Sequence, residues 1–202
     1  MVEYKKDEIR NEVHDWVLEL YKEGYEYQAI ILLLATWNFA YFRYVLTSLN
    51  LKEFKRKLRR LKETDFKFFE NKAFESIDLN NQRTIESIKN IYTTLSDSGI
   101  KQVGATKVMY LLNPKVFVMW DNGIITHYHK KFKNDRSVGK LDKTAEGYVN
   151  FMKLMQKLYA KKKFPQPKGE TTIPRAIDLF NWEHYRTNKK TKAGSLHHHR
   201  VL

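Results

Sequence analysis

The stretch GIKQVGATKVMYLLNPKVFVMWDNGI, residues 99–124, decides the fold that we expect for this chain. It predicts a helix from about Gly104 to Leu112, because apolar residues dominate there and the asparagine and proline that follow stop a helix. A short apolar run comes next. Asp121 then begins a further helix, since an aspartate side chain caps exposed backbone N–H groups.

The rest of the chain is also expected to be helical. It contains only 8 Gly and 4 Pro, its apolar residues recur at three- and four-residue spacing, and no alternating strand pattern is long enough to indicate a sheet. The fold class predicted is all-α, a single compact multi-helix domain over residues 1–190. The further helices are expected at about 9–20, 27–46, 52–62, 80–95, 122–132, 143–160 and 173–185.

Residues 191–202 are expected to lie outside this domain. They contain a glycine, a serine and three adjacent histidines, a pattern typical of a disordered tail or a cloning remnant. These histidines are therefore left out of the functional argument.

The expected turn at Gln102-Val103-Gly104 is a candidate phosphate site. Backbone N–H groups at a helix start and the positive end of the helix dipole attract an anion. Lys101 and Lys107 flank this turn in the sequence. The alternative is an ordinary turn between two helices that uses glycine for its left-handed conformation.

These features together resemble the helix-hairpin-helix DNA glycosylase superfamily, which includes endonuclease III and the 8-oxoguanine and adenine glycosylases. The resemblance implies an all-α fold and a hairpin, at about residues 96–124, that grips DNA phosphate. It also implies that Asp121 takes part in cleaving an N-glycosidic bond. The matching residues are Ile100, Val103 and Gly104 in the hairpin, 108–112 in the next helix, and Val118-Met119-Trp120-Asp121.

The chain departs from the family at three points. Gln102 stands where the family has the first hairpin glycine, and Thr106 stands where bifunctional members carry a nucleophilic lysine. Lys107 comes one residue later, which on a helix turns it by about 100°. The chain has no cysteine, which excludes the iron–sulfur branch of the family.

Asp121 and Lys107 are the candidate catalytic residues. A carboxylate can stabilise an oxocarbenium-like sugar or orient an attacking water, so Asp121 is a candidate for that role beside its role as a helix cap. Lys107 is a candidate for attack on the sugar carbon. A phosphate contact or a surface charge is the alternative for Lys107.

The resemblance also implies a base pocket, because these enzymes flip the target base out of the duplex. The candidates for its lining are aromatic residues and polar residues in apolar surroundings: Trp37, Asn38, Arg43 and Trp120. Ordinary core positions are the alternative for each. No metal and no cofactor are expected, since His127 and His129 do not share a helix face and no third ligand is evident.

The charge balance favours a polyanion as partner. Lys and Arg number 37 against 23 Asp and Glu, a net charge of +14, and basic residues gather at 52–62, 130–140 and 161–163. Double-stranded DNA is the partner predicted first. A membrane is not expected, because the apolar segment 27–46 contains Arg43 and is interpreted as a core helix. The charged N-terminus indicates no signal peptide, which favours the cytoplasm.

The sequence therefore predicts a DNA-binding protein that resembles base-excision glycosylases of DNA repair. It is expected to cleave the N-glycosidic bond of a damaged or mismatched base, with or without lyase activity. Two alternatives stay open: a helix-hairpin-helix protein that binds nucleic acid without turnover, and a basic protein-interaction domain.

Overall fold

The computed structural model describes residues 6–37, 42, 47, 49–169 and 171–195, and the side chains of 12–36, 42, 47, 49–169 and 171–184. Across this part of the chain the structure consists of helices, turns and irregular segments, with no strand. The predicted all-α fold class is thus confirmed. The helices are α1 Lys6–Lys22, α2 Glu26–Trp37, α4 Leu51–Leu61, α5 Gln82–Leu95, α6 Lys101–Leu112, α7 Asn122–Phe132, α8 Ala145–Ala160 and α9 Ile173–Ser195.

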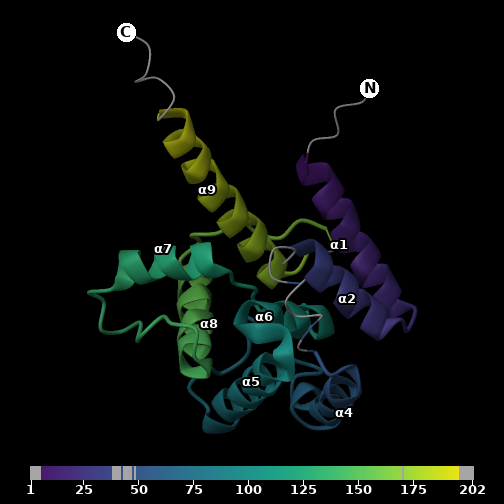
Figure 1. Ribbon diagram of the computed structural model, residues 1–202. Helices are drawn as coiled ribbons and strands as arrows, with labels where there is room; N and C mark the ends of the chain where they lie inside the picture. Colours follow the sequence, from purple (N-terminus) through teal and green to yellow (C-terminus); the bar gives the residue numbers. More distant parts are fainter. Residues whose placement is uncertain (1–5, 38–41, 43–46, 48, 170, 196–202) are drawn as a thin grey trace, which may run out of the picture.

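Helix α6 lies at the centre of the fold, between α2 and α5 (Figure 1). Residues 104–111 are all buried, as is expected for a helix that has no polar face. Gly104 lets α2 approach closely, because a Cβ at this position would lie 3.2 Å from Leu34 Cδ2 and 3.3 Å from Ile100 Cβ. One continuous apolar cluster runs from Val17 in α1 to Ile177 in α9.

Two helix starts are fixed by short-range hydrogen bonds, of which the sequence predicted the one at Asp121. Asn81 accepts a bond from Thr84 N at 3.1 Å at the start of α5, and Asp121 accepts one from Ile124 N at 2.8 Å at the start of α7. Both side chains satisfy N–H groups that a helix leaves open in its first turn. The predicted bounds of these two helices therefore agree closely with the structure.

The chain reverses direction earlier than the sequence predicted. The π-helical turn η2, Ser96–Ile100, continues α5, and the reversal lies at Gly99 and Lys101, whose φ angles are 99° and 59°. The segment 102–104, predicted as the turn, forms the first turn of α6 instead. The reason is that Gly99 supplies the left-handed conformation, while Gly104 is needed for close packing.

The C-terminal boundary also differs from the prediction. Helix α9 continues to Ser195, ten residues beyond the expected end at 185. Lysine, arginine and alanine are good helix formers, and no proline interrupts residues 175–195. The final residues, 196–202, lie outside the described part of the chain, as do most of 38–46 in the predicted second helix.

Helix α4 is basic and amphipathic. Phe54, Leu58 and Leu61 are buried in the core, while the cations lie on the opposite face. Asn50 caps the helix by accepting a hydrogen bond from Glu53 N at 3.1 Å. Burial of the apolar stripe fixes the orientation of α4 and leaves its lysines and arginines in solvent.

Candidate functional site

The proposed phosphate site begins at the reversal between α5 and α6. Lys101 is exposed, and Gln102 and Val103 are half-buried in the first turn of α6. Among the described residues, no side chain caps this helix start, and no acidic residue lies in its first turn. The backbone N–H groups and the positive end of the helix dipole at this start are suited to an anion.

Lys101 adopts a strained backbone conformation. Its φ of 59° and ψ of 178° form a combination that residues other than glycine rarely hold. Such strain costs on the order of 1–3 kcal/mol and gathers at functional sites. A glycine would remove the strain, so the lysine at this turn lowers the free energy of unfolding of the protein.

Lys107 and Gly104 occupy the interior of the fold. Lys107 is 6% exposed in the middle of α6, so of the two lysines that flank the predicted turn only Lys101 presents its side chain to solvent. Gly104 is also buried, against α2. The set predicted to bind phosphate is thereby divided: residues 101–103 reach the surface, whereas Gly104 and Lys107 do not.

Thr106 connects α6 to the segment that carries Asp121. Its side chain is fully buried, its hydroxyl donates to Val103 O at 3.0 Å, and it accepts a hydrogen bond from Trp120 N at 3.4 Å. This contact joins residues 14 apart in sequence. Sequence reasoning noticed Thr106 only as a departure from the family, because the contact depends on a second segment of chain.

Asp121 is exposed at the N-terminus of α7 and is held in one geometry. Its Oδ1 accepts the hydrogen bond from Ile124 N at 2.8 Å, and its own backbone is extended. A Cβ at Gly123 would come within 3.2 Å of the same oxygen, so the glycine leaves the carboxylate uncrowded. The cap role is confirmed, and the exposed position is compatible with an additional chemical role.

Trp120 lies directly behind Asp121 in an aromatic cluster. It is 1% exposed and packs against Tyr92, Tyr148 and Phe151, with ring centroids 5.1 to 6.0 Å apart. Its Nε1 is buried and has no hydrogen-bond partner among the residues that the structure describes. A side chain this deeply packed offers no face to a flipped base, so the structure corrects the expectation that Trp120 lines an open base pocket.

Two tyrosine hydroxyls fix the aromatic cluster to the backbone. Tyr148 donates to Val118 O at 2.9 Å and Tyr92 donates to Lys143 O at 2.8 Å. Burial raises the pKa of both hydroxyls, so they stay protonated and act as donors. The segment that leads to Asp121 is thus anchored on a rigid support.

The remaining candidates for a base pocket fall outside what the structure describes. Trp37 ends α2, but its side chain is not among the described ones, and Asn38 and Arg43 lie outside the described residues. Their assignment stays a prediction.

A buried polar cluster joins α1, α6 and α9, and the sequence did not indicate it. His14 Nε2 lies 3.2 Å from Tyr110 Oη, and Arg175 Nη1 donates to Asp178 Oδ2 at 2.9 Å. Burial raises the pKa of Tyr110, with opposing effects from the neighbouring charges. Only the tertiary fold brings these side chains together, since they come from three distant helices.

Among the described residues, no group of three or more histidine and acidic side chains is arranged to hold a metal ion. In the same part of the chain, no helix is both long and apolar enough to cross a bilayer. No protein-family model, curated protein or solved structure matches this chain.

Proposed function

We propose that the protein binds duplex DNA and cleaves the N-glycosidic bond of a damaged or mismatched base. Asp121 would be the carboxylate that stabilises positive charge on the sugar or orients the attacking water. The observation that carries the proposal is the position of Asp121. It is exposed, fixed by Ile124 N, and adjacent to α6 through the Thr106–Trp120 contact.

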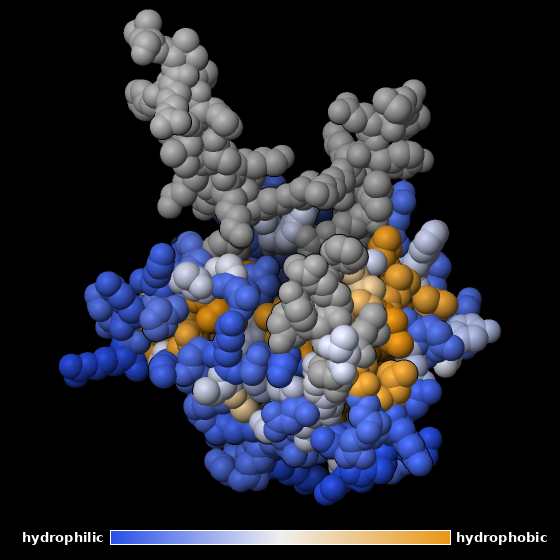
Figure 2. Space-filling view, viewed as in Figure 1, coloured by the Kyte–Doolittle hydropathy of each residue, from blue (hydrophilic) through white to orange (hydrophobic). Residues whose placement is uncertain are grey.

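The electrostatics of the exposed surface support DNA as the partner. The chain carries a net charge of +14, and Lys101 stands at the uncapped start of α6. The face of α4 that points away from the core is hydrophilic (Figure 2) and carries Lys52, Lys55, Arg56, Arg59 and Arg60. Such cations neutralise phosphates and release counterions, which supplies most of the affinity for duplex DNA.

The proposed reaction requires a negative charge that is held in a fixed position beside the sugar. Glycosidic cleavage passes through an oxocarbenium-like state, and a carboxylate already in position stabilises it without a cost of reorganisation. The hydrogen bond to Ile124 N provides this fixed position at Asp121. In this proposal Lys107 is the candidate nucleophile, and borohydride trapping of a Schiff base on a damaged duplex tests that role.

The decisive experiment is excision from a panel of duplexes that each contain one damaged or mismatched base. Asp121→Asn is the matched variant, because asparagine caps a helix as well as aspartate but carries no charge. We expect the variant to keep its melting temperature and to lose excision by at least 100-fold, a magnitude typical of removing one electrostatic stabiliser. Full activity in Asp121→Asn would refute the catalytic role.

A second candidate is a helix-hairpin-helix protein that binds DNA without turnover. The burial of Trp120 and Lys107 favours it, because two residues expected at the chemistry lie in the interior. Salt-dependent duplex binding with no excision from any substrate in the panel would establish this alternative.

A further inference from the structure

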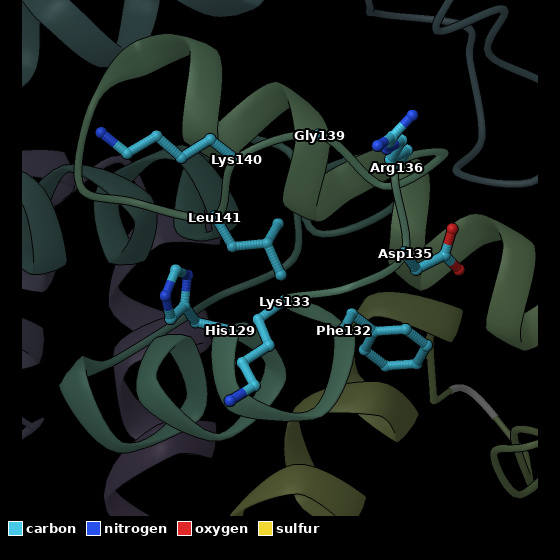
Figure 3. A pocket seen from close by; sticks show the side chains of 8 residues that line it. All are labelled: His129, Phe132, Lys133, Asp135, Arg136, Gly139, Lys140 and Leu141. Atoms are coloured by element: carbon cyan, nitrogen blue, oxygen red, sulfur yellow. The ribbon is translucent and has the colours of Figure 1, made fainter.

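A cavity at the far end of α7 is lined by basic residues that the proposed catalytic site does not use. It has a volume of about 220 Å³ and lies between the last turn of α7 and the loop 133–141. Figure 3 shows His129, Phe132 and Lys133 along one side, Gly139 and Lys140 along the other, and Leu141 pointing into the middle. The centre of the cavity is therefore apolar and its rim is cationic.

The loop that closes this cavity is built into the fold. Val138 and Leu141 are buried, at 6% and 4% exposure. Gly139 has a φ of 71°, and a Cβ there would come within 2.7 Å of Asn150 Nδ2, which itself donates to Lys140 O at 3.1 Å. These contacts hold the rim in place before any ligand arrives, which lowers the entropic cost of binding.

The charges on the rim are predominantly positive. Lys133, Arg136 and Lys140 line the cavity together with one carboxylate, Asp135, whose Oδ1 already accepts hydrogen bonds from Ser137 N at 3.0 Å and Ser137 Oγ at 2.6 Å. Lys140 pairs with Asp142 at 2.9 Å. Lys133 and Arg136 form no ion pair with any other described residue, so their charges are available to a ligand.

We propose that this cavity holds the sugar–phosphate backbone of duplex DNA at a distance from the target nucleotide. The apolar centre suits the C–H groups of a deoxyribose, and the rim cations suit the phosphates on either side of it. Helix α7 has 11 residues, so about 16 Å separates the cavity from Asp121 at the other end. That length corresponds to about five base pairs of duplex at 3.4 Å each.

This inference rests on the proposed DNA binding but does not depend on catalysis. Its test is the affinity of the full chain for a short lesion-free duplex, measured by fluorescence anisotropy over a range of salt concentrations. The test variant is the pair Lys133→Ala and Arg136→Ala. The matched control is Lys22→Ala and Lys115→Ala, which removes two exposed cations that lie outside the basic segments assigned to DNA and likewise form no ion pair with a described residue.

Each phosphate contact contributes about 0.9 to the slope of log affinity against log salt, which is about a fivefold gain in affinity at 0.15 M. We therefore expect the cavity pair to weaken binding by about 30-fold and to reduce the slope by about 1.8. The control pair is expected to cost less than half of that slope. Melting curves establish that each variant is folded, and Lys133→Gln with Arg136→Gln repeats the test with uncharged polar side chains closer in size to the original ones.

Two results overturn the inference: wild-type affinity in the cavity pair, or equal losses in the two pairs, which would indicate a general charge effect. Neither result bears on excision, so the proposed activity is judged separately by Asp121→Asn. Loss of binding in the cavity pair together with no excision from any substrate would keep the cavity as a DNA site and remove the enzymatic proposal.

Discussion

Lys101 provides a test in which stability and binding are expected to change in opposite directions. Replacing it by glycine relieves a backbone conformation with φ of 59° and ψ of 178°. Relief of such strain is worth about 1–3 kcal/mol, and the greater freedom of glycine in the unfolded chain takes back about 0.5–1 kcal/mol. The net expectation is a gain of about 0.5–2 kcal/mol in the free energy of unfolding.

For a chain of 202 residues, this gain corresponds to a rise of roughly 1–8 °C in melting temperature, since each kcal/mol shifts it by about 2–4 °C. The same substitution removes one cation from the proposed hairpin. It should weaken binding to duplex DNA by about fivefold at 0.15 M salt and reduce the salt slope by about 0.9. Thermal melting and fluorescence anisotropy measure the two effects on the same sample.

Two control variants separate the two causes. Lys101→Gln removes the charge and keeps the strain, so affinity should fall while the melting temperature stays unchanged. Lys162→Gly relaxes the other lysine with positive φ among the described residues, at 55°, and should raise stability at little cost in affinity. A lower melting temperature in Lys101→Gly would refute the strain argument. Unchanged affinity in both Lys101 variants would refute the role of the hairpin in DNA binding.

Three further substitutions test a buried hydrogen bond, a close helix contact and a titrating histidine. Thr106→Val leaves Trp120 N without its acceptor and should lower the free energy of unfolding by about 1–2 kcal/mol in urea titrations. Gly147→Ala should destabilise the protein by about 1–3 kcal/mol despite better helix propensity, because the added Cβ would lie 2.2 Å from Asp142 O. Burial lowers the pKa of His127, so the unfolded chain binds the proton more readily. The contribution of His127 to the free energy of unfolding should therefore be fully present above the ordinary pKa of 6.5 and decline as the pH falls through this value. His127→Asn should reduce this decline. Urea midpoints measured at pH values above and below 6.5 test this expectation.

The cap at Asp121 is compatible with the proposed chemical role of the same residue. A cap holds its carboxylate through a short backbone hydrogen bond, here 2.8 Å to Ile124 N, and the same bond would keep the negative charge in place during a reaction. Neither role excludes the other. For this reason Asp121→Asn separates them better than Asp121→Ala, which would remove both at once.

The sequence by itself determined the elements whose causes are local. Apolar spacing indicated the helices, Asp121 was recognisable as a cap, and the run of cations at 52–62 indicated the basic segment that forms α4. Each of these features depends on residues within one or two helical turns of each other. Propensity, capping and amphipathic spacing act over that distance, so they can be read from a linear pattern.

Only the tertiary structure decided which residues of the candidate site reach the surface. Lys107 and Trp120 carry polar or amphipathic side chains, yet the helices and aromatic rings packed around them bury both. The Thr106–Trp120 contact and the cavity beside α7 each combine separate segments of chain. Gly104 has its function in the approach of α2, and not in the turn that the sequence predicted. Burial and long-range contact depend on how the helices pack against one another, and local sequence does not contain that information.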